Sequence, residues 1–400
     1  MTSIEIERHA RPSASPIIFQ GGFRLLFLGG AIWALVVVAL WVMALSGAIA
    51  LPTAMDPLAW HQHEMLFGYL SAVIAGFLTA AIPNWTGRPT MTGWPVAGLV
   101  GTWLAARLAI LFSTVIPPIV GATLDIGFLL LLFAYAAREV FAAKNRNKPI
   151  LAVILLFALA SGLDHVDGMG APVADGIGMR AGFSLVLVLI AIIGGRIIPA
   201  FTRNWLSRQG RTERLPAQMN AFDKIAIAIL CIALGLWTAV PSAQPAALLL
   251  IVAGVLHVVR LARWAGLSAA RDPLVFILHI SYAWLPAGLV LLGVSIVSPE
   301  IPVSGAMHAL AAGAMASMTL AVMTRATRGH TGRPLEADRA TILIYVLVTL
   351  GAMLRVAAPL LPIDYMLSIR LAGGLWGAAF LLFALVYGPM LLGPRADRRA

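Results

Sequence analysis

The residues of this chain that could do chemistry are mainly histidines that stand within or beside long apolar stretches. The segment "WHQHEMLFGYLSAVIAGFLTAAIPNWTGRP" (60–89) begins with His61, His63 and Glu64 and continues as apolar sequence. Four further histidines have comparable surroundings: His165, His257, His279 and His308. Neutral imidazole is a common ligand of haem iron and of copper. The pattern therefore predicts a buried metal or haem site, although any one of these histidines taken alone is explained equally well by a structural hydrogen bond or helix cap.

The composition indicates a membrane protein. Hydrophobic residues make up 60% of the chain and charged residues 11%, whereas globular proteins carry about 25% charged residues. Apolar runs long enough to cross a bilayer as helices, roughly 18 residues or more, recur along the sequence. We expect twelve spans, at 24–50, 62–82, 95–115, 118–143, 150–166, 176–200, 221–240, 244–264, 274–297, 303–325, 339–359 and 366–391. The fold class is all-α and polytopic, with a single transmembrane domain over 24–392, a cytoplasmic segment 1–23 and a basic cytoplasmic tail 393–400.

The distribution of Lys and Arg predicts the orientation of these spans. With the N-terminus in the cytoplasm, all but five of the 28 basic residues fall on cytoplasmic loops and span ends; the five are Arg107, Arg180, Arg196, Arg355 and Arg370. Cytoplasmic loops of membrane proteins carry such an excess of positive charge. Both termini are therefore expected in the cytoplasm. The net charge of +11 then reflects this rule and contact with anionic lipid, not nucleic-acid binding.

Two of the expected spans are copies of each other. "HEMLFGYLSAVIAGFLTAAIPNWTGRP" (63–89) aligns without a gap to "HALAAGAMASMTLAVMTRATRGHTGRP" (308–334) at an offset of 245 residues. A weaker third copy, "AFTRNW", ends the sixth span, which indicates repeated four-helix units with spans 2, 6 and 10 equivalent. Small residues at every fourth position of both strong copies predict close helix packing inside the bundle.

The repeat makes His63 and His308 the first candidates for a shared ligand pair. His61 cannot share a helix face with His63, because two residues turn a helix by about 200°. The two could converge only if His61 lies on the loop that enters the span. His165 is a further candidate for a metal at the outer ends of the spans, and His257 and His279 could bind a cofactor nearer the cytoplasm. Glu64 is the candidate catalytic proton donor. Three arginines are candidates for haem propionates or for ion pairs with Asp125 or Asp364: Arg107, Arg196 and Arg355.

The motifs that are present or absent limit which cofactors the chain could hold. The sequence has no CxxCH motif for covalent haem attachment and only one cysteine, Cys231. A haem would therefore be a non-covalent haem b, with copper as the second candidate metal. The sequence also lacks a P-loop and a dinucleotide-binding GxGxxG motif.

Several longer motifs carry a family resemblance. "WHQHEMLFG", "IPNWTGRP", "GGRIIPAFTRNWL", "LHISYAWLPAGL" and the 308–334 copy resemble the NnrS family of bacterial inner-membrane proteins over about residues 20–392. The resemblance implies a twelve-helix protein that holds haem and copper and takes part in nitric oxide metabolism and protection from nitrosative stress. It does not say which histidine binds which metal.

Three functions fit these expectations. The first is an oxidoreductase that removes nitric oxide and reduces it to nitrous oxide, with electrons from quinol or a redox protein. The second is a transporter with a copper or proton relay, since twelve spans with internal repeats are common among transporters. The third is a haem-bearing sensor or assembly factor that binds nitric oxide without turnover.

Overall fold

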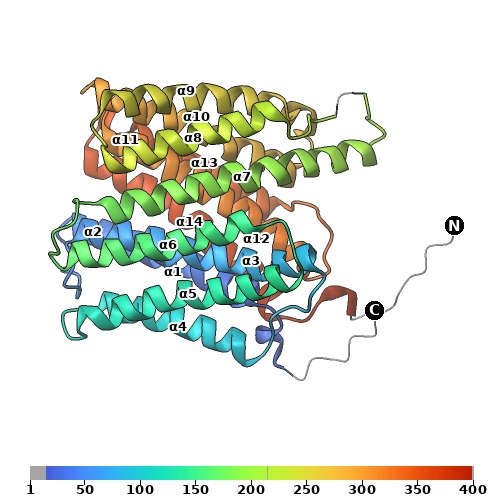
Figure 1. The fold of residues 1–400 in the computed structure, drawn as a ribbon, viewed down its shortest axis with the longest axis horizontal. Coiled ribbons are helices and arrows are strands. Elements are labelled where there is room, and N and C mark those ends of the chain that lie inside the picture. Colours follow the sequence, from blue (N-terminus) through green and yellow to red (C-terminus); the bar gives the residue numbers. More distant parts are fainter. Residues whose placement is uncertain (1–14, 214, 399–400) are drawn as a thin grey trace.

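The twelve expected spans are confirmed by a computed structural model, which describes residues 15–213 and 215–398 (Figure 1). Within these ranges the secondary structure is entirely helical. The uninterrupted spans are α1 (Gly22–Leu45), α4 (Trp94–Leu111), α5 (Pro118–Ala142), α6 (Lys148–Gly168), α7 (Ile177–Arg208), α8 (Ala221–Ala239), α9 (Gln244–Ala262), α10 (Pro273–Val297) and α14 (Tyr365–Leu392). Three spans are composite: α2 (Pro57–His63), η2 (Glu64–Leu70) and α3 (Ser71–Thr86); α11 (Val303–His308), η4 (Ala309–Met315) and α12 (Ala316–His330); α13 (Arg339–Ala357) and η5 (Ala358–Leu360).

Some boundaries differ from those expected. The second span begins at Pro57 instead of 62, because Asp56 caps it and accepts hydrogen bonds from the backbone of Leu58 and Ala59. The sixth span continues to Arg208, past Pro199 and beyond the expected end at 200. Hydropathy marks only the apolar zone of a helix, so it does not detect the polar turns that extend beyond that zone.

The two copies of the sequence repeat also share their backbone conformation. The second and tenth spans each change from α-helix to π-helix directly after their histidine, over Glu64–Leu70 and Ala309–Met315. These two segments are related by the same offset of 245 residues as the sequence copies. The glycines of the two TGRP motifs, Gly87 and Gly332, also share a left-handed conformation, with φ of 68° and 70°. The two copies therefore fold alike in detail.

The copied spans lie in the interior of the bundle, as their small residues predict. They are the two most buried spans of the described chain. The Tyr69 hydroxyl is hydrogen-bonded to Thr319, which links the second span to the tenth. The sixth span meets both, because one apolar cavity is lined by residues from all three spans, among them Leu70, Ile190 and Met315.

The first and last spans lie side by side, and the start of one meets the end of the other. Arg24, at the start of α1, donates hydrogen bonds to the carbonyl oxygens of Leu391 and Gly393, at 2.7 and 2.8 Å. The start of α1 and the end of α14 are thus on one side of the bundle, which agrees with an even number of spans (Figure 1). That this side faces the cytoplasm remains a prediction from the Lys and Arg distribution, and residues 1–14, 399 and 400 of the expected terminal segments lie outside the described chain.

Candidate metal site

His63 is held in a fixed orientation by a carboxylate at the end of α6. Its Nδ1 donates a hydrogen bond to Asp164 Oδ2 at 2.8 Å, and its ring is fully buried. Histidine ligands of metals are commonly oriented in this way by a carboxylate on the nitrogen that does not bind the metal. The bond fixes the tautomer and leaves the lone pair of Nε2 free.

Nε2 of His63 points toward two further metal-ligating groups. Asp125, in the first third of the fourth span, has its Oδ2 3.5 Å from His63 Nε2 and 3.4 Å from His165 Nε2. The ligand atoms of the three residues all lie within 4.8 Å of one another, and all three side chains are buried. His63 Nε2 makes no hydrogen bond within the described chain. Two imidazoles and one carboxylate suit copper, zinc or iron, so the residues present fit a metal ion.

Arg107 connects this group to Glu64. The guanidinium forms an ion pair with Asp125 through one nitrogen and with Glu64 Oε2, at 2.7 Å, through another. Trp33 Nε1 donates a second hydrogen bond to Glu64 Oε2 at 2.6 Å, and Ser161 donates one to Asp125 Oδ2, also at 2.6 Å. One of the two partners suggested for Arg107 by the sequence, Asp125, is thus confirmed, and Glu64 is its second partner.

As ionised groups, the side chains of this cluster carry a net negative charge. Glu64, Asp125 and Asp164 contribute three negative charges and Arg107 one positive charge; Glu64 and Asp125 are fully buried, and the side chain of Asp164 is 13% exposed. Uncompensated charge is strongly unfavourable away from water. A divalent metal ion at His63, Asp125 and His165 would neutralise the cluster.

Gly68 lets these groups come together. A Cβ at this position would stand 2.6 Å from Arg107 Nη1 and 3.0 Å from Trp33 Nε1, and closer still to Glu64. The backbone oxygen of Gly68 also accepts a hydrogen bond from Trp103 Nε1 at 2.9 Å. Gly68 is one of the small residues of the first copy, and the side chains for which it leaves room are those that anchor the metal group.

His61 and His308 lie apart from this group. The helix α2 already includes His61, because Asp56 and Pro57 start the helix before it, so the loop that would let His61 converge with His63 is not formed. The ring of His61 stacks on Trp41, with ring centres 5.0 Å apart, and takes no part in the group around His63. The Nδ1 of His308 donates to the carbonyl oxygen of Ser304 at 2.7 Å. The structure thus brings His63 together with His165, and it places neither His61 nor His308 in that group.

The remaining two candidate histidines, His257 and His279, lie toward the opposite side of the bundle. His257 donates from Nδ1 to the carbonyl oxygen of Ala253 at 3.0 Å, and its buried Nε2 has no partner among the described residues. His279 Nε2 is hydrogen-bonded to Thr202 at 2.8 Å. His257 therefore has a free Nε2 for an axial haem ligand, and His279 has a free Nδ1, which faces Gly266.

Sequence reasoning missed Asp164 and Ser161. Asp164 directly precedes His165 in "GLDHVDG", so an acid beside a histidine at the end of a span was the available signal. Ser161 lies one turn before His165 and carried no signal of its own, because serine is common in membrane helices.

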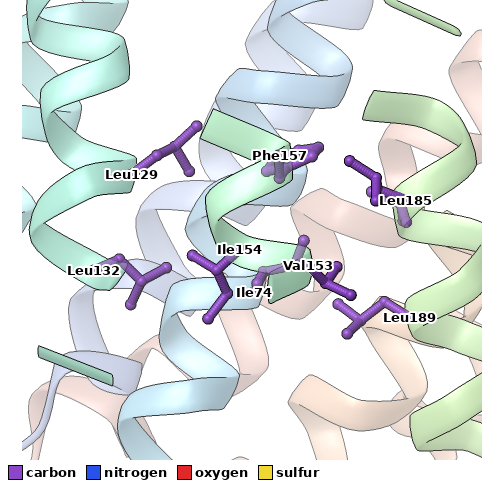
Figure 2. A pocket seen from close by; sticks show the side chains of 9 residues that line it. Ile74, Leu129, Leu132, Val153, Ile154, Phe157, Leu185 and Leu189 are labelled. Carbon is purple, nitrogen blue, oxygen red and sulfur yellow. The ribbon is translucent and has the colours of Figure 1, made fainter. Parts of the chain in front are cut away.

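Two apolar pockets lie deeper in the bundle than the metal group. The larger, about 80 Å³, lies between the second, sixth and tenth spans. The smaller, about 10 Å³, adjoins it and is lined by nine apolar side chains that include Ile74 and Phe157 (Figure 2). Phe157 packs on Phe67, and Phe67 packs on His63, with ring centres 5.0 and 5.2 Å apart. An apolar series of side chains thus leads from the centre of the bundle to the metal group.

The comparisons with known proteins identify the family. Residues 17–395 match the sequence model described as "NnrS protein", which is nearly the whole chain. The chain belongs to the NnrS family. Among curated proteins, no sequence matches it. Membership of the NnrS family is consistent with a role in nitric oxide-related metabolism, and the family is known for binding metal or haem in general. With twelve apolar spans, this NnrS chain is a multi-pass membrane protein.

Proposed function

We propose that this protein binds and removes nitric oxide in the bacterial inner membrane, at a centre that contains copper and haem b. The observation that carries the proposal is the buried group of His63, Asp125 and His165, whose ligand atoms converge and whose surroundings hold more acidic than basic side chains. Copper bound there would supply a redox-active Lewis acid. Asp164 orients the imidazole of His63, and Arg107 holds the second oxygen of Asp125 away from the metal position.

The surroundings of the group suit a small apolar substrate. Nitric oxide dissolves in hydrocarbon, and the 80 Å³ cavity is several times the volume that one water molecule needs, about 10–15 Å³. Its lining is apolar apart from Thr319, so it favours an apolar gas over water. From there, Phe157 and Phe67 form the apolar approach to His63.

The overall reaction would be the reduction of two nitric oxide molecules to nitrous oxide and water. Two electrons and two protons are needed, and one quinol, or a reduced redox protein together with protons from the medium, supplies both. Glu64 is the proposed proton carrier, since its Oε1 is free of hydrogen bonds while Oε2 is held by Arg107 and Trp33. A carboxylate held by one oxygen can take up and release a proton on the other.

Haem b is the proposed second cofactor. His257 and His308 each donate Nδ1–H to a backbone carbonyl, which leaves Nε2 as the available ligand atom, as an axial imidazole requires. His61 Nδ1 is buried without a hydrogen bond and is a further candidate. The 80 Å³ cavity is much smaller than pockets for drug-sized ligands, about 300–1,000 Å³, and has no histidine in its lining. Haem would therefore have to bind elsewhere, at these histidines.

Metal analysis together with nitric oxide consumption tests the proposal. Protein purified in nanodiscs should contain copper by mass spectrometry and haem b by the pyridine haemochrome assay, and should consume nitric oxide with a quinol. Asp125→Asn and His165→Ala should each remove most of the copper and most of the consumption, whereas His330→Ala, away from the group, should change neither. Copper content and consumption near wild type in both site variants would show that the cluster is structural. Metal binding without turnover would indicate a sensor.

A further inference from the structure

One aromatic side chain, Phe67, connects the metal group to the apolar pockets. Its ring packs on the ring of His63, with ring centres 5.2 Å apart, and on the ring of Phe157, at 5.0 Å. Phe157 lines the smaller pocket (Figure 2). Phe67 itself is fully buried. A molecule that moves from this pocket to His63 along these side chains therefore has to displace the ring of Phe67.

The helices that build the metal group also line the smaller pocket. In α5, Leu129 follows Asp125 by four residues, and in α6, Phe157 precedes Asp164 by seven residues. Residues with these spacings lie on one face of a helix. Both Leu129 and Phe157 line the pocket. The pocket is therefore only one to two helical turns from the metal group, about 6–11 Å along the helix axes.

Gly182 of α7 leaves room for the ring of Phe67. A Cβ at this position would stand 2.6 Å from Cζ of Phe67 and 2.8 Å from its Cε1, which is closer than side chains pack. Val186, one turn further along α7, lines both apolar pockets. The tip of the ring thus lies against the backbone of α7 beside the pockets, and a side chain at residue 182 would take space from this passage.

The metal group can also be reached from solvent. The side chains of Asp164 and His165 are 13% and 7% exposed, whereas Phe67 has no exposed surface. A charged molecule is excluded from the apolar pockets, because moving a charge into apolar surroundings is strongly unfavourable. Charged ligands therefore have to arrive from solvent at Asp164, and the route past Phe67 is left to apolar molecules.

We propose that Phe67 is a selectivity gate, which admits apolar molecules the size of a diatomic gas from the pockets to the metal group and excludes larger ones. The smaller pocket, about 10 Å³, has room for about one molecule the size of water, so only a molecule of that size fits beside the ring. The inference rests on the proposed function, because it requires a metal at His63, Asp125 and His165 whose ligand is an apolar gas.

Ligand binding to the metal, without turnover, measures the gate. Copper-loaded protein in nanodiscs is reduced, and the binding of carbon monoxide after flash photolysis is followed by its infrared stretch on copper. Phe67→Ala, and the more conservative Phe67→Leu, should speed this binding by about tenfold or more. Both variants should also admit tert-butyl isocyanide, a larger apolar ligand that the wild type excludes. Gly182→Ala should slow the binding of carbon monoxide, because its methyl group occupies the same passage.

Two matched controls and one charged ligand show whether these effects are specific. Phe141→Leu changes an exposed phenylalanine of α5, and Gly235→Ala adds a methyl group where there is open space. Both controls should bind carbon monoxide as the wild type does. Azide, which is charged, binds to the oxidised copper from solvent, so its rate should be unchanged in the variants of Phe67 and Gly182.

Three results would overturn the gate. The first is a rate of carbon monoxide binding in both Phe67 variants within about twofold of wild type. The second is an equal rise of the carbon monoxide and azide rates, which would show a general loosening of the site. The third is loss of copper from Phe67→Leu, which would make the ring a structural support of His63.

The copper content of every sample separates this inference from the proposed function. A wild-type protein without copper would overturn the proposed function, and the gate with it. Bound copper together with unchanged rates in the Phe67 variants would overturn the gate alone. Because the assay measures binding, a protein that binds nitric oxide without turnover would still show the gate.

Discussion

Replacing Asp164 by asparagine tests the orientation of His63 directly. The amide oxygen of asparagine can still accept the hydrogen bond from His63 Nδ1, which is 2.8 Å long with Asp164, so the ring should keep its place. The negative charge that makes Nε2 a stronger ligand is lost. Changes of this kind to a partner of a metal ligand reduce metal affinity by about 10–100-fold, which corresponds to about 1.4–2.8 kcal/mol.

Competition with chelators of known copper affinity, on protein in nanodiscs, measures the effect. Asp164→Asn should lose copper affinity by a factor near the lower end of that range. Asp164→Leu, which removes the hydrogen bond as well, should lose more copper affinity. Asp175→Asn is the matched control, because Asp175 is an exposed acid in the loop that follows α6. A copper affinity of Asp164→Asn within about twofold of wild type would refute the orientation argument, since the contact would then contribute nothing to ligand strength.

Three other predictions concern the stability and orientation of the protein. Arg107→Met should destabilise it by about 3–5 kcal/mol, because two buried carboxylates lose their partner, and the double variant with Glu64→Gln should recover part of the loss in thermal unfolding. Gly68→Ala should lower both the melting temperature and the copper content, because the added methyl group meets Arg107 and Trp33. Gly101→Ala is the control and should be neutral, because there is open space around Gly101. Equal behaviour of the two variants would contradict this account. Alkaline phosphatase fused within 170–175 should be active, and fused at the C-terminus inactive; the reverse pattern would invert the proposed topology.

The number of spans and the repeat could be read from the sequence because both depend on local patterns. Length and hydropathy mark a span, and an offset of 245 residues without a gap marks a copy. The partners of His63 could not be read in the same way. The repeat favours His308, but Asp164, on a different four-helix unit, holds Nδ1 of His63. The pairing with His165 is set by how α5 and α6 pack around α2, which no local pattern records.

The secondary structure at His61 could not be predicted from a local sequence pattern either. The sequence "DPLAWHQH" is compatible with a loop, and only the side-chain hydrogen bonds of Asp56 to Leu58 and Ala59 decide that a helix has already begun. The partners of Arg107 are equally hidden, because Glu64 and Asp125 come from two other spans.

The π-helical segments have a consequence for insertions and deletions. A π-helix turns by less per residue than an α-helix. Over such a segment, the rotation about the helix axis therefore differs from that of an α-helix by roughly the turn of one residue. Deleting a single residue such as Met65 would let the segment return to α-helical geometry and would swing His63 around the axis relative to α3. The chain length between histidine and helix is thus itself a determinant of where the imidazole points, and the same holds for His308 and α12.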